Sequence, residues 1–97
     1  MIAELQVLPR PAGTEAVPYA NVEAAIAALG ASGLRVEVGA LGTTIEGAPN
    51  AVWAALRASH EATLAAGADS VVSIIKLAES AGDAGPGIED LAGPFRD

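Results

Sequence analysis

The feature that most constrains the fold is the order in which two hydrophobic periods follow one another along the chain. Four short segments alternate between apolar and polar residues, which is the period of a half-buried β-strand. They are residues 2–8, 34–40, 43–46 and 70–77. In two longer segments, 18–33 and 49–67, apolar residues recur every three or four positions, as along one face of an α-helix. The predicted order is therefore strand, helix, strand, strand, helix, strand.

Proline and glycine mark the ends of these segments. Pro9 and Pro11 are expected to end the first strand, because proline cannot donate a hydrogen bond to a ladder. Pro18 and Pro49 suit the first turn of a helix. Gly33 and Gly67 are typical of positions just past a helix C-terminus. These boundaries leave short connections, as expected for a small domain.

This order of elements predicts an α+β fold, the ferredoxin-like βαββαβ sandwich. Two helices would cover one face of a four-stranded antiparallel sheet with strand order 4-1-3-2. Residues 34–46 would form a hairpin that turns at Leu41-Gly42. We assign this domain to residues 1–78. Residues 79–97 are expected to be a Gly- and Pro-rich C-terminal tail, with a short turn around 88–91.

The sheet face without helices is predicted to be too apolar to stay exposed to water. It would carry both apolar and charged side chains: Ile2, Leu8, Leu41, Val72 and Ile74 beside Glu4, Gln6, Glu46 and Lys76. The domain also has little bulk for its core, since 23 of its 97 residues are alanine and only 3% are aromatic. A small core of this kind is marginal by itself. We therefore expect an oligomer in which a second sheet packs on this face.

The charge and the missing residue types exclude several classes of function. The net charge is −7, with only five Lys and Arg, so a nucleic acid or an anionic membrane surface is an unexpected partner. An acidic field mildly favours cationic ligands. The absence of cysteine excludes disulfides, zinc-thiolate sites and thiol catalysis. With no signal peptide pattern and no long apolar run, a cytoplasmic location is expected.

Several short motifs, in order along the chain, resemble those of the thiamine-binding (YkoF-like) family of small bacterial and archaeal proteins. They are AELQVLP at 3–9, SGL at 32–34, LGTTIEG at 41–47, HEA at 60–62, AG at 66–67 and IKL at 75–77. The resemblance covers about residues 2–77. It implies a ferredoxin-like fold, dimers built through sheet faces and often paired into tetramers, and non-catalytic binding of thiamine or its hydroxymethylpyrimidine half. It also implies ligand contacts at Val7, through its backbone, and at Thr43.

The predicted topology places further polar side chains near these two residues. By alternation, Val7, Thr43 and Ser73 point toward the helices at the same end of the sheet. Tyr19 lies at the start of the first helix and His60 toward the end of the second, so both are expected to converge there. An aminopyrimidine needs a few directed donors and acceptors between apolar walls, and the alanines would leave room for it. Each residue also has a structural interpretation, as a strand, packing, core or surface side chain.

No catalytic residue, metal site or cofactor is predicted. A single His, no Cys and scattered carboxylates give no convincing set of metal ligands. The sequence also lacks a P-loop, a nucleophile elbow and a dinucleotide fingerprint. The resemblance, together with the polar cluster at one end of the sheet, implies a soluble carrier or sensor of thiamine or a related pyrimidine. Two alternatives stay open: a protein-interaction module that uses the bare sheet face, and a small cofactor-free dimeric enzyme that uses His60 or Lys76.

Overall fold

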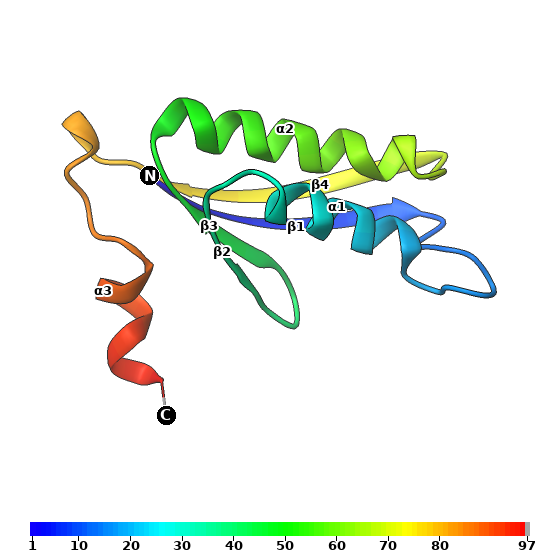
Figure 1. Ribbon diagram of the computed structural model, residues 1–97, viewed down its shortest axis with the longest axis horizontal. Coiled ribbons are helices and arrows are strands. Elements are labelled where there is room, and N and C mark those ends of the chain that lie inside the picture. Colours follow the sequence, from blue (N-terminus) through cyan, green and yellow to red (C-terminus); the bar gives the residue numbers. More distant parts are fainter. Residues whose placement is uncertain (97) are drawn as a thin grey trace.

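The computed structural model describes residues 1–96 and confirms the predicted α+β architecture (Figure 1). The domain consists of β1 (Ile2–Arg10), α1 (Ala20–Gly30), β2 (Arg35–Val38), β3 (Thr43–Glu46), α2 (Pro49–Ala65) and β4 (Ser70–Ala78). The C-terminal segment adds α3 (Ile88–Ala92) and two short 3-10 turns, Ala81–Asp83 and Gly93–Phe95. The four strands form one antiparallel sheet in the order β2-β3-β1-β4, which is the predicted order 4-1-3-2 read from the other edge. Helices α1 and α2 pack against one face of it.

The first strand ends at Arg10, directly before Pro11 as expected, but Pro9 does not end it, because β1 continues through that residue. Met1 and Gly47 exchange two backbone hydrogen bonds across the β1–β3 pair, at 3.0 and 3.1 Å. Since every second pair of an antiparallel ladder bonds in this way, the N–H and C=O groups of odd-numbered β1 residues face the β3 side. β3 stops at Thr43, opposite Leu5. Pro9 lies beyond that point, so its missing N–H removes no ladder bond.

A small apolar core fills the space between the sheet and the two helices. Its buried members are Ala3, Leu5, Leu29, Ile45, Val52, Ala55 and Leu56. On α2 the apolar spacing predicts a buried stripe of Val52, Leu56, Ser59 or His60, and Thr63. This is confirmed, with Ser59 buried at the third of these positions. No helix among residues 1–96 has the length and apolar character that crossing a bilayer requires.

On α1 the apolar spacing predicts a buried stripe of Val22, Ile26 and Leu29; Leu29 is confirmed, but the other two buried positions lie one residue earlier. Asn21, Ala25 and Leu29 are buried, whereas Val22 and Ile26 are only half-buried. The single methyl group of Ala25 lets α1 pack directly against α2 on that side. The larger Val22 and Ile26 side chains are consequently turned away from the core, toward the hairpin of β2 and β3.

The C-terminal segment is more ordered than the loose tail that the sequence suggested. We call residues 81–96 the arm. The backbone N–H of Ile88 donates to the Glu46 carboxylate at 2.5 Å, and Arg35 pairs with Glu89 at 2.7 Å. Ile88 itself is buried. The arm is therefore anchored to β2 and β3, through side chains on the sheet face opposite α1 and α2. Two further ion pairs hold it, between Asp83 and the Met1 amino group and between Arg96 and Glu37 of β2.

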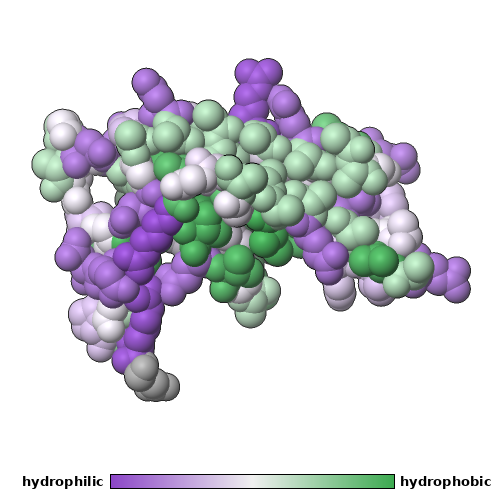
Figure 2. All heavy atoms as spheres, viewed as in Figure 1, coloured by the Kyte–Doolittle hydropathy of each residue, from purple (hydrophilic) through white to green (hydrophobic). Residues whose placement is uncertain are grey.

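The remainder of this sheet face, over β1 and β4, is uncovered in the single chain. Its exposed apolar residues include Leu8, Val72 and Ile74. Leu41, which was predicted to lie on this face, instead occupies the turn between β2 and β3 and lines a pocket on the helix side. The correction follows from the turn geometry, because strand alternation does not extend into a hairpin loop. The side of the molecule shown in Figure 2 is mostly apolar over the helices, whereas the arm is mostly hydrophilic.

Candidate functional site

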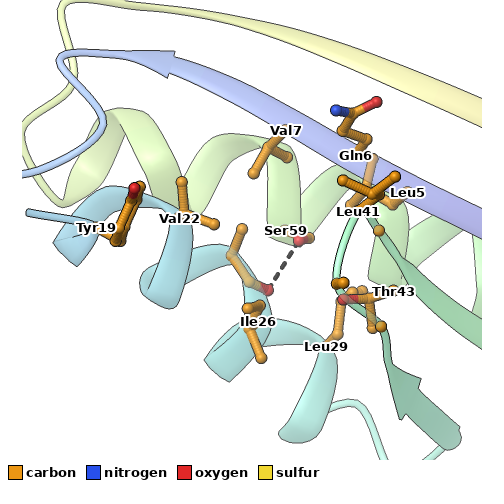
Figure 3. Close-up of a pocket in the computed structure, with 14 residues that line it drawn as sticks. Leu5, Gln6, Val7, Tyr19, Val22, Ile26, Leu29, Leu41, Thr43 and Ser59 are labelled. Carbon is orange, nitrogen blue, oxygen red and sulfur yellow. Dashed lines mark hydrogen bonds between the residues drawn. The ribbon is translucent and has the colours of Figure 1, made fainter.

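The principal cavity of the domain is a pocket of about 420 Å³ between α1, β1 and the β2–β3 turn (Figure 3). Val22 and Ile26 of α1 form one wall and Val7 of β1 forms another. Tyr19 and Leu41 are largely exposed and lie at the rim. The volume falls in the range of small-molecule sites, which are typically mostly apolar with a few placed polar groups. The pocket is large enough for a single small aromatic ring system.

The hairpin turn determines where the pocket lies along β1. The Gly39 N–H donates to the Gly42 carbonyl at 2.8 Å and closes a loop of two residues, 40–41. At Gly42 a Cβ atom would lie 3.3 Å from the carbonyl oxygen of Leu5, so glycine permits the close approach of the turn to β1. Because the hairpin turns back at this point, no strand continues alongside β1 beyond Leu5. The space left there is the pocket.

Besides the Tyr19 phenol at the rim, two aliphatic hydroxyl groups line the pocket, and they are used differently. The Ser59 hydroxyl donates a hydrogen bond of 2.8 Å to the carbonyl of Ala25, so it ties α2 to α1 (Figure 3). Thr43 is 4% exposed and begins β3 at the pocket. Among residues 1–96 none of the assigned side-chain hydrogen bonds involves its hydroxyl, and no fully buried side-chain polar atom is left unpaired. The Thr43 hydroxyl is thus available to a ligand.

The backbone of Val7 offers a further donor and acceptor. The N–H and C=O of this odd-numbered residue face the β3 side, and β3 has ended two residues earlier on β1, opposite Leu5. Within residues 1–96, no backbone hydrogen bond outside the regular ladders involves Val7. Its N–H and C=O therefore lie at an open strand edge within the pocket lining, two residues along β1 from Leu5, which pairs with Thr43.

The structure brings three of the five predicted site residues to this pocket and leaves two outside it. Val7, Thr43 and Tyr19 line the pocket. Ser73 pairs with Val7 on the β4 side of β1, and its Oγ lies 2.5 Å from Nδ1 of His60. His60 and Ser73 are not pocket residues because β1 separates β4 from β3. Ligand contact by any of the five stays a prediction.

Sequence reasoning missed part of the pocket wall. Val22 and Ile26 were assigned to the core, because periodicity cannot distinguish a side chain that faces the core from one that faces a cavity. Leu41 was assigned to the opposite face. The available signal was the pair Gly39 and Gly42, which is typical of a tight hairpin turn that can approach a neighbouring strand.

The structure gives little support for a metal or for acid–base residues in the pocket. Among residues 1–96, no group of three or more His, Cys, Asp or Glu side chains is placed to hold a metal ion. Lys76 lies 3.8 Å from Glu4 on the opposite sheet face, where both are exposed. Tyr19 is the one ionisable side chain among the described residues that line the pocket. The pocket is thus equipped to bind through hydrogen bonds and apolar contact.

Solved structures with the same fold come from bacteria and archaea. A domain of unknown function from Bacillus cereus is 29% identical and has a TM-score of 0.85, covering 99% of this chain and 89% of that one. A hypothetical protein from Methanocaldococcus jannaschii is 30% identical, with a TM-score of 0.78, covering 97% and 93% of the two chains. A Thermotoga maritima protein, assigned provisionally to thiamine biosynthesis or salvage, shares the fold at 22% identity and a TM-score of 0.81, with 98% and 97% covered.

The family comparison extends the resemblance seen in the motifs. No curated protein matches the sequence. The family model described as thiamine-binding protein matches residues 3–90, from β1 into α3, and so includes the first part of the arm. This match spans nearly the whole chain, including every element that forms the pocket. The chain therefore belongs to the thiamine-binding protein family.

Proposed function

We propose that this protein binds thiamine, or its hydroxymethylpyrimidine half, in the pocket between α1 and the β2–β3 turn, without converting it. It would act as a carrier or sensor in the cytoplasm. The observation that carries the proposal is the open backbone edge of Val7 in a pocket with apolar walls that also includes the Thr43 hydroxyl. Membership of the thiamine-binding family supports the same ligand class.

The chemistry of an aminopyrimidine fits these groups. Its amino group is a donor, and the adjacent ring nitrogen is an acceptor. The C=O and N–H of Val7 form the complementary pair, as a neighbouring strand would find them in an antiparallel ladder. Thr43 can serve another ring nitrogen with its hydroxyl. Val22 and Ile26 offer apolar contact to the faces of the ring.

The lining also favours binding over catalysis. General acid–base catalysis requires an ionisable group within hydrogen-bond reach of the reacting atoms. Tyr19 is 65% exposed at the rim, and His60 is held against Ser73 outside the pocket. These positions support the binding and release of a ligand without any chemical change to it.

Replacing Thr43 with valine is expected to weaken the binding of hydroxymethylpyrimidine about tenfold. The substitution keeps the shape of the pocket but removes the hydroxyl that would bond to a ring nitrogen of the ligand. The measurement is calorimetric titration of both protein forms with thiamine and with hydroxymethylpyrimidine. Thr44→Val is the matched control, since Thr44 is the next residue of β3 and points to the opposite sheet face. Absence of heat with either ligand at millimolar concentration would contradict the proposed function.

We also propose that two copies pack through the uncovered half of the sheet face over β1 and β4. Val72 and Ile74 are 60% and 47% exposed there. The neighbouring Glu4 and Lys76 are paired at 3.8 Å, so these two opposite charges on the patch offset one another. Leu91 and Phe95 of the arm are also exposed apolar side chains, which a second copy could cover. Such a dimer would compensate for the small core.

Replacing Ile74 with glutamate is expected to shift the protein to a monomer in sedimentation velocity runs, because each copy would bury a charge against an apolar face. Leu64→Glu is the matched control, since Leu64 is 43% exposed on α2, away from this face. A wild-type protein that sediments as a monomer at high micromolar concentration would refute the dimer.

A further inference from the structure

We infer that the pocket selects the unphosphorylated alcohol, hydroxymethylpyrimidine or thiamine, against the corresponding phosphate esters. This inference rests on the proposed function and adds the class of ligand that the pocket excludes. It follows from three independent features of the structure: the lining of the pocket, the start of α1 and the placement of the basic residues.

The described residues of the lining offer a phosphate group no cationic partner, only the few neutral donors that the proposed function assigns to the ring. A phosphate ester carries a charge of about −1.5 to −2 at neutral pH and three strong acceptor oxygens. None of the described residues that line the pocket is Lys, Arg or His. A charge that enters an apolar site without a partner loses its hydration and gains little in exchange.

The start of α1 is closed to anions. A helix N-terminus next to a pocket commonly binds phosphate through its free N–H groups. Here the N–H groups of Asn21 and Val22 both donate to the Ala12 carbonyl, at 2.9 and 3.4 Å. The N–H groups of the residues before and after them also donate to backbone carbonyls of the chain. Glu23 then places a carboxylate in the first turn, where it repels a second anion.

The basic residues are committed elsewhere. Four of the five are held in ion pairs outside the pocket, namely Arg35, Arg57, Lys76 and Arg96. On the arm, hydrogen bonds from Arg35 and Arg96 lower the pKa of the Glu89 carboxyl. The fifth, Arg10, ends β1 with its exposed side chain directed by alternation to the other sheet face. The net charge of −7 is therefore not offset at the pocket.

The loss of affinity on phosphorylation should differ between the two ligands. In hydroxymethylpyrimidine the phosphate would be attached one carbon from the ring, so it must enter the pocket with the ring. In thiamine the phosphate would be attached to the far end of the thiazolium side chain, which can extend past Tyr19 and Leu41 into solvent. The penalty is then limited to long-range repulsion by an acidic protein, which salt screens.

The inference is tested by calorimetric titration of the wild-type protein with four ligands: hydroxymethylpyrimidine, its monophosphate, thiamine and thiamine monophosphate. We expect hydroxymethylpyrimidine monophosphate to bind at least about tenfold more weakly than the free alcohol, since like charges and lost hydration both oppose it. Thiamine monophosphate should show a smaller loss. Esters that bind as tightly as the alcohols, or more tightly, overturn this inference and leave the proposed function standing. If no ligand binds, the proposed function falls and the inference with it.

A charge added at the rim tests the cause. Leu41→Lys places an ammonium group beside the pocket, and Leu41→Met is the matched uncharged variant, since Leu41 is 83% exposed and tolerates either side chain. The readout is the ratio of the dissociation constants of hydroxymethylpyrimidine monophosphate and hydroxymethylpyrimidine. We expect this ratio to fall several-fold in Leu41→Lys relative to Leu41→Met. An unchanged ratio would show that missing positive charge is not the reason for selection, and would overturn the argument.

Discussion

Replacing Gly13 with alanine is expected to lower the free energy of unfolding by about 2–4 kcal/mol and to weaken ligand binding with it. A Cβ atom at this position would lie 2.5 Å from the backbone nitrogen of Ala20 and 2.5 Å from the carbonyl carbon of Pro18, and closer still to the Val17 oxygen. All of these are backbone atoms, so no side-chain rotation can relieve the contact. The loop before α1 must move as a whole.

The movement of this loop would affect the helix and the pocket together. The loop supplies the Ala12 carbonyl that accepts the hydrogen bonds of Asn21 and Val22, and it carries Tyr19 to the pocket rim. A displaced loop therefore leaves the start of α1 without its acceptors. It also shifts the wall formed by Val22.

Gly30→Ala is the matched control for this substitution. Gly30 is the last residue of α1, and no atom lies within 4 Å of a Cβ built there. Alanine at that site is expected to stabilise the protein by about 0.5–1 kcal/mol, because it removes backbone freedom from the unfolded chain. Urea denaturation followed by circular dichroism measures both variants. Equal stability of Gly13→Ala and wild type would contradict the close packing of the loop.

The course of the fold could be predicted from the sequence because it depends on local periodicity. The spacing of apolar residues predicts each of the two helices and four strands, and Pro49 begins α2 as expected. One strand order then satisfies all of them. Pro9 was misjudged because the effect of a proline depends on which side of the strand its nitrogen faces, and this is fixed by the register with β3.

The pocket and the arm could be predicted only in part, because both depend on contacts between distant residues. The alternation that directs Val7, Thr43 and Ser73 to the helix side is correct. It does not show that the pocket lies on the β3 side of β1, away from Ser73 on β4. Similarly, the ion pair between Arg35 and Glu89 joins residues 54 positions apart and leaves no periodic signal. Each exposed ion pair also adds little to the stability of the fold, and the amino-acid composition does not show which charged residues will pair.

Replacing Val7 with proline is expected to weaken the binding of hydroxymethylpyrimidine about tenfold to hundredfold while leaving the sheet intact. Proline removes the N–H that we assign to the ring nitrogen of the ligand, and an unpaired acceptor in a buried site costs about 1–3 kcal/mol. The N–H of Val7 has no strand opposite it, since β3 ends at Thr43. The free energy of unfolding should therefore change by only about 1 kcal/mol.

Leu8→Pro is the contrasting variant, one residue further along the same strand. The N–H of Leu8 faces β4, where Leu8 pairs with Val72. Its loss is expected to lower the free energy of unfolding by about 2 kcal/mol or more, because a ladder bond is broken and a backbone carbonyl is left unpaired. Calorimetry and urea denaturation on the two variants separate binding from folding. If both variants lose the same stability, the assignment of the Val7 N–H to the pocket is wrong; Pro9, two residues after Val7 and tolerated within β1, already supports it.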